Sequence, residues 1–103
     1  MDRAVTMRKT ELVATGRAER RSARVALVER SFSSKELDAA LDLLELLEIA
    51  WHDCYGEPTP PEQVIDDALV VAGGSLAGLI RASRLALTDW RDLRVTALEI
   101  TDG

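Results

Sequence analysis

Most of the rare reactive side chains of this chain lie together in residues 51–57. The segment holds the only His, the only Cys and the only Tyr of the 103 residues, and one of the two Trp, as His52, Cys54, Tyr55 and Trp51. Imidazole, thiol and phenol groups are side chains that enzymes use as bases, nucleophiles and acids. The spacing matches no motif that dictates a reaction, so the sequence marks a place for function without specifying the chemistry.

Glu48 and His52 are four residues apart, the spacing at which a helix brings two side chains together. A carboxylate in this position can orient the imidazole as a general base or as a metal ligand. The same spacing is typical of a surface pair near a helix C-terminus. A metal site needs more ligands, and although Glu45 shares the face, the chain has no second His or Cys cluster. We predict no catalytic residue, no metal and no cofactor, and keep as the alternative function a small enzyme or metal-binding protein centred on His52 with Glu48 or Asp53.

The other side chains of this segment have different expected roles. Cys54 and His52 point about 200° apart on a helix, so they do not form a dyad, and Cys54 is predicted to be a small buried apolar residue. Trp51 and Tyr55 lie at the edge of the apolar side, where they serve either the core or an interface with a partner.

A long amphipathic helix is predicted over residues 34–55. Ser33 and Glu36 have the spacing of a capping box, and Gly56 can adopt the left-handed conformation that ends a helix. About half of the circumference is apolar and rich in leucine. The other half is predicted to be an exposed acidic face that carries Asp38, Asp42, Glu45, Glu48, His52 and Asp53, interrupted by Leu41 and Ile49.

The remaining helices are predicted from capping residues that precede apolar runs of helical period. These are Thr59 before 60–72, Ser75 before 76–87, and Asp89 before a last stripe with Trp90, Leu93, Ala97 and Ile100. Residues 17–30 also have helical spacing. The segments near 23–30 and 93–100 alternate as paired strands would, so an α+β fold remains the alternative to the predicted all-α bundle of four or five helices.

Charge is distributed unevenly along the chain. Residues 1–34 hold eight basic and four acidic side chains, 35–74 hold one and ten, and 75–103 hold four of each. A basic arm can lie across the acidic body, or the two can bind different partners. The basic cluster of Arg17, Arg20, Arg21 and Arg24 lacks interleaved aromatic residues, and the chain is acidic overall, so we do not expect nucleic-acid binding.

A chain of this length is expected to form one domain, here residues 11–103. Residues 1–10 are expected to be a disordered extension, and the sequence does not show whether the first six of them are translated. The lack of a signal peptide, a membrane-spanning run or paired cysteines favours the cytoplasm. Self-association is possible through leftover apolar positions such as Leu41, Ile49, Val70 and Leu85.

The function predicted from these features is a non-enzymatic protein-binding or regulatory module. Its acidic helix face would bind a partner with a basic surface, or the chain would bind itself, without a membrane partner. The predicted binding residues are Glu45, Glu48, Trp51, His52, Asp53, Tyr55 and Glu57.

Overall fold

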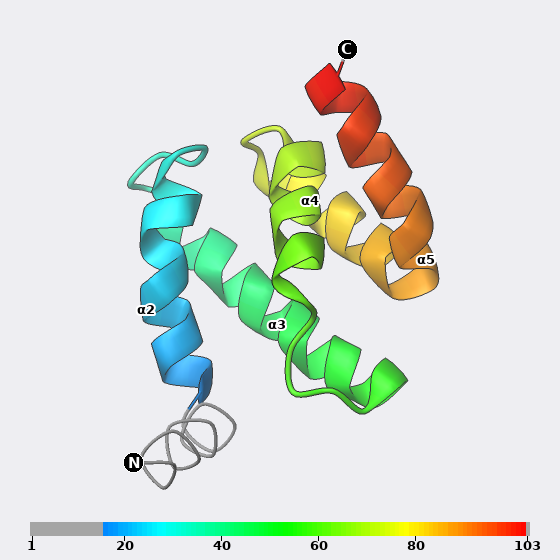
Figure 1. The fold of residues 1–103 in the computed structure, drawn as a ribbon. Coiled ribbons are helices and arrows are strands. Elements are labelled where there is room, and N and C mark those ends of the chain that lie inside the picture. Colours follow the sequence, from blue (N-terminus) through cyan, green and yellow to red (C-terminus); the bar gives the residue numbers. More distant parts are fainter. Residues whose placement is uncertain (1–15, 103) are drawn as a thin grey trace, which may run out of the picture.

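The computed structural model describes residues 16–102 and contains four helices and no strand within that range. In chain order they are α2 (Gly16–Glu29), α3 (Leu37–Tyr55), α4 (Glu62–Ala72) and α5 (Leu76–Asp102), as Figure 1 shows. The predicted all-α bundle is therefore confirmed. The strand alternative is wrong, because residues 23–30 lie largely in α2 and residues 93–100 lie in α5. The extension predicted over residues 1–10 lies outside the described residues.

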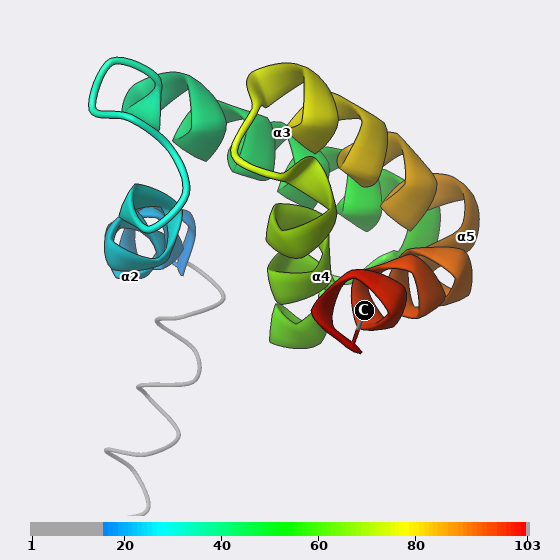
Figure 2. The same ribbon diagram turned by 90° about the horizontal axis from the view of Figure 1, so that it is seen from above.

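Helix α3 has neighbouring helices on two of its sides. Helix α2 packs against one side of it, and α4 and α5, which form the most extensive helix pair, lie on the other (Figures 1 and 2). Fully buried aliphatic side chains from three helices form the centre, and each contributes roughly 1.5–3 kcal/mol relative to an exposed position. These residues are Leu44, Leu47, Ile65, Leu79 and Leu93.

The two ends of α3 differ in how well the sequence predicts them. Gly56 has φ of 76°, and its amide donates to the His52 carbonyl at 2.8 Å, so the predicted end is confirmed. The predicted start is wrong, because α3 begins at Leu37 and Glu36 takes the N-cap position without a side-chain hydrogen bond. The Glu36 amide instead donates to the Ser33 carbonyl at 3.0 Å, which makes a backbone turn where a capping box was expected.

Helix α4 also begins later than predicted. Pro61 is its N-cap residue, and no side chain caps the helix. The Thr59 hydroxyl, predicted to be the cap, accepts a hydrogen bond from the Arg24 guanidinium at 3.1 Å. A tertiary contact with α2 has therefore replaced the local cap.

Helix α5 consists of two helical halves that meet at Asp89, where the backbone is non-helical, and Figure 1 shows the bend. Both predicted caps are confirmed. Ser75 Oγ accepts from the Gly78 amide at 2.9 Å, and Asp89 Oδ1 accepts from the amides of Arg91 and Asp92 at 3.1 and 3.3 Å. The bend brings the second half of α5 beside α4, where Leu93 is buried.

Apolar side chains also reach the surface. Of the positions predicted for self-association, Ile49 is 42 % exposed, whereas Leu41 is only 3 % exposed and belongs to the core, so its predicted role is wrong. Self-association through the others stays a prediction. None of the helices between residues 16 and 102 combines the length and the apolar composition that crossing a bilayer requires.

Gly78→Ala should lower stability, although alanine normally stabilises a helix interior by about 0.5–1 kcal/mol relative to glycine. A Cβ atom at this position would overlap the carbonyl oxygen of Ala72 and crowd Ser75 Oγ. The start of α5 would have to move away from the end of α4, at a cost of about 1–3 kcal/mol as in other overpacked sites. Urea unfolding followed by circular dichroism measures the change. A higher unfolding midpoint for the variant would contradict this close approach.

Candidate functional site

The predicted acidic face of α3 is partly covered by α2. Arg21 contacts three of its carboxylates, with Nη1 at 2.8 Å from Asp42 and 3.3 Å from Glu45, and Nη2 at 3.8 Å from Asp38. The basic segment therefore lies across the acidic helix and neutralises part of it. Asp38 and Asp42 keep side-chain exposures of 93 % and 66 %, whereas Glu45 retains 30 %.

Glu48 lies in the interior and not on the surface as predicted, because only 1 % of its side chain is exposed. Arg20 Nε and Arg24 Nη1 both donate to its Oε2 atom, the latter at 2.7 Å. Burial would raise the pKa of Glu48, but the hydrogen bonds from Arg20 and Arg24 outweigh it and hold the pKa below its ordinary value. Glu48 is thus an ionised structural group, and the predicted Glu48–His52 pairing is wrong.

Arg24 extends this cluster to the next helix. Its Nη2 atom donates to Thr59 Oγ1 and, at 3.0 Å, to Glu62 Oε2, so one buried guanidinium joins α2, α3 and the start of α4. Its Nε atom is buried and has no hydrogen-bond partner within the described residues. The sequence signal for this role was the spacing of Arg17, Arg20, Arg21 and Arg24 along one side of a helix.

His52 lies on the surface at the end of α3. Its side chain is 63 % exposed, and its Nδ1 atom is 4.0 Å from Asp53 Oδ1. The side chain borders an open hollow of about 510 Å³, together with Arg17, Arg20 and Pro58. Among residues 16–102, no three His, Cys, Asp or Glu side chains lie close enough together to hold a metal ion.

Cys54 is exposed, so its predicted burial is wrong. The buried side of α3 includes Leu44, Leu47 and Trp51. Cys54 lies seven residues after Leu47 and so falls near that side by helical geometry, but it is in the last turn of α3, just before Gly56, and is left exposed there.

Trp51, Tyr55 and Glu57 form one connected group. Trp51 is 3 % exposed, and its indole Nε1 donates to Glu57 Oε1 at 2.8 Å. The rings of Trp51 and Tyr55 have centroids 4.3 Å apart with an interplanar angle of 45°. Tyr55 is 43 % exposed, and its hydroxyl donates to the Leu87 carbonyl at 3.1 Å, which ties the end of α3 to α5.

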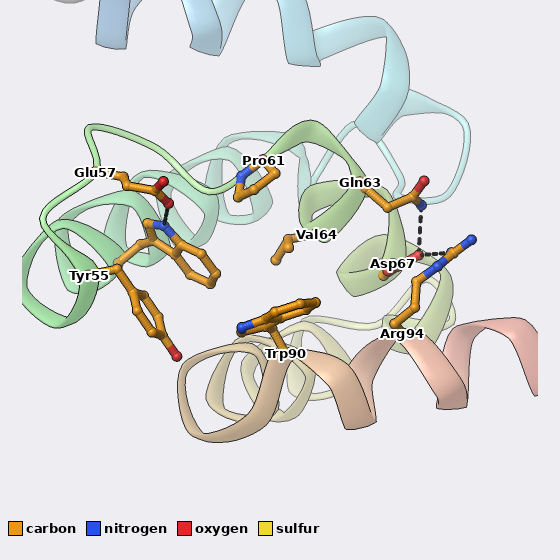
Figure 3. Close-up of a pocket in the computed structure, with 9 residues that line it drawn as sticks. Tyr55, Glu57, Pro61, Gln63, Val64, Asp67, Trp90 and Arg94 are labelled. Carbon is orange, nitrogen blue, oxygen red and sulfur yellow. Dashed lines mark hydrogen bonds and ion pairs between the residues drawn. The ribbon is translucent and has the colours of Figure 1, made fainter.

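This group borders a cavity of about 460 Å³. Figure 3 shows Tyr55 on the α3 side of the cavity and Trp90 on the α5 side, with Val64 of α4 and the preceding Pro61 across from Trp90. Three of the four aromatic residues of the chain, both Trp and the only Tyr, line this one space.

The far end of the cavity is polar. Asp67 has a side-chain exposure of 5 %, and its Oδ1 atom accepts from Arg94 Nη1 at 2.8 Å and from Gln63 Nε2 at 3.0 Å. Trp90 is 42 % exposed, and the Arg91 guanidinium carbon lies 5.4 Å from its ring centroid.

Sequence reasoning did not identify the α4 and α5 walls of the cavity. It placed Trp90 in a helical stripe and did not include Gln63, Asp67 or Arg94 among the predicted binding residues. The one available signal was that Trp90 is the second of only two Trp in a chain poor in aromatic residues.

Comparison with protein-family models, curated proteins and solved structures yields no match for this chain. The functional argument therefore rests on the cavity and on the charges around it.

Proposed function

We propose that this protein is a small helical binding module, without a reaction of its own, that docks a partner protein at the aromatic cavity. The gathering of Trp51, Tyr55 and Trp90 in one partly open space carries this proposal. Trp and Tyr are enriched among the residues that dominate binding energy at protein interfaces. Tyr55 and Trp90 are both more than 40 % exposed, an unusual use of scarce aromatic residues in a domain whose core is mostly aliphatic.

The charge near the cavity favours a basic partner. Glu57 is exposed at the cavity, and Asp53, in the last turn of α3, borders the hollow beside His52 and has a side-chain exposure of 78 %. Exposed carboxylates of this kind steer a positively charged surface toward an apolar anchor site. The proposed docking surface is therefore the end of α3 and the adjoining cavity, because Glu48 and much of Glu45 are occupied by arginines of α2. We place the interaction in the cytoplasm, as the sequence predicts.

Charge reversal on the proposed docking surface, at the end of α3 and at the cavity, should abolish partner capture. The variant Asp53→Lys with Glu57→Lys, used as bait in a lysate of the cells that produce the protein, should recover at least about tenfold less of the partners that wild type recovers, because attraction becomes repulsion. Quantitative mass spectrometry of the captured proteins measures the ratio.

The matched control is Glu99→Lys with Asp102→Lys, two exposed positions at the end of α5 that do not line the cavity. This control should retain the wild-type partners. Equal recovery by both double variants would remove the proposed docking surface.

A further inference from the structure

We infer that the aromatic cavity binds an organic cation, the guanidinium or ammonium head of a basic side chain that the partner protein inserts. That the cation belongs to a protein rests on the proposed function. The cation itself is inferred from the walls and the charges of the cavity.

The walls supply the surfaces that organic cations prefer. Trp and Tyr rings carry negative electrostatic potential on their faces, and a guanidinium or alkylammonium group within about 6 Å of a ring centroid is attracted to it. Tyr55 and Trp90, each more than 40 % exposed, bring two accessible rings to the cavity from α3 and α5, and the buried Trp51 ring is also part of its lining. Pro61 and Val64 also line the cavity, and their apolar surfaces suit the aliphatic stem of arginine or lysine.

Trp90 already makes one contact of this type. The guanidinium carbon of Arg91 lies 5.4 Å from its ring centroid, within the range of a cation–π interaction. The chain itself therefore shows that this ring accepts a guanidinium group, and the ring also lines the cavity.

The charged groups of the lining favour a cation over a neutral group. Two carboxylates, Glu57 and Asp67, and one guanidinium, Arg94, give the lining a formal charge of −1. Arg94 is paired with Asp67 at 2.8 Å, which leaves Glu57 as the uncompensated charge. Glu57 Oε1 accepts from the Trp51 indole, and its Oε2 atom has no partner within the described residues. An inserted cation can pair with that oxygen, whereas a neutral apolar side chain cannot.

Intrinsic fluorescence provides a direct test, because both Trp of the chain line the cavity. The probes are choline and 3,3-dimethylbutan-1-ol, which have nearly the same shape but differ in charge. Choline should change the fluorescence in a saturable manner with an affinity about tenfold higher than the neutral alcohol. Equal affinity for both, or no binding of either, would overturn the assignment of a cation site.

A second pair of probes tests the source of the cation. N-acetyl-arginine methylamide and N-acetyl-lysine methylamide present the two basic side chains as a protein would. At least one of them should bind as tightly as choline or more tightly. Binding of choline alone would overturn the assignment to a protein side chain and make the cavity a site for a small metabolite cation.

The variant Glu57→Gln removes the charge and retains an oxygen that can accept from the Trp51 indole. It should reduce the preference for choline over the alcohol about fivefold, the effect expected from the loss of one exposed charge pair. The control Glu99→Gln makes the same charge change on α5 outside the cavity and should keep the wild-type preference. An unchanged preference in Glu57→Gln would remove Glu57 from the site. If partner capture fails on charge reversal while no cation probe binds, the docking surface stands and only the cation site is lost.

Discussion

Glu48→Gln is expected to lower the free energy of unfolding by about 3–5 kcal/mol, the cost of removing one partner from a buried ion pair. The side chain is 1 % exposed, and it is the carboxylate that both Arg20 and Arg24 contact. The amide cannot compensate two guanidinium groups, and Arg24, itself only 4 % exposed, would keep its charge in the interior with only the largely exposed Glu62 still paired to it. A domain of this size has a total stability of about 5–15 kcal/mol, so a large part of it would be lost. Urea unfolding followed by circular dichroism measures the difference.

Asp42→Asn provides the matched control on the same helix. Asp42 also pairs with an arginine of α2, at 2.8 Å from Arg21, but its side chain is 66 % exposed. Exposed pairs contribute about 0–1 kcal/mol, so this variant should unfold at nearly the wild-type urea concentration. Equal losses in the two variants would contradict the assignment of Glu48 as a buried charge.

The contribution of Glu48 should also depend on pH. Because the pKa of Glu48 is lowered in the folded state, its contribution is present above the pKa of the unfolded chain, about 4.3 for glutamate. The contribution is lost as the pH falls through the lower folded pKa, since protonation then removes the charge that the arginines bind. The stability difference between wild type and Glu48→Gln should therefore be constant near neutral pH and shrink below about pH 4. A difference that stays constant down to pH 2 would contradict the lowered pKa.

The helices were predictable where local residues determine the backbone. Gly56 ends α3, while Ser75 and Asp89 cap the two halves of α5, because glycine conformation and short-range side-chain hydrogen bonds act within a few residues. The start of α4 was not predictable in this way. Thr59 is an excellent local cap, but Arg24, 35 residues earlier in the chain, uses its hydroxyl. The Thr59 hydroxyl accepts from this distant arginine and does not cap α4.

The candidate site shows the same division between local and long-range information. Helical periodicity assigned Glu48 to an exposed acidic side of α3, but periodicity does not state which neighbour covers a side of a helix. The arginines of α2 cover it, so a residue predicted for binding became part of the core. Trp51 and Trp90 are 39 positions apart in the sequence, and only the packing of α5 against α3 and α4 brings them to one cavity. The rarity of its residues marks the segment 51–57 in the sequence. The α4 and α5 walls of the cavity are visible only in the folded structure.

Trp51→Ala and Trp90→Ala should differ sharply in stability although both residues line the cavity. Trp51 is 3 % exposed, packs on Tyr55 and donates to Glu57, so its truncation should cost about 3–5 kcal/mol. Trp90 is 42 % exposed and contacts Arg91 near the surface, so its truncation should cost about 1 kcal/mol or less. Thermal unfolding of the two variants under identical conditions measures the contrast.

This contrast determines which variant can report on binding. A loss of binding in Trp51→Ala could come from unfolding, because Trp51 lines the cavity and also packs in the core at the end of α3. A folded Trp90→Ala protein that no longer binds the cation probes would assign the loss to the missing ring itself. If Trp90→Ala instead unfolds as readily as Trp51→Ala, then Trp90 is a core residue, as the helical stripe alone would indicate, and the α5 wall of the proposed docking site is lost with it.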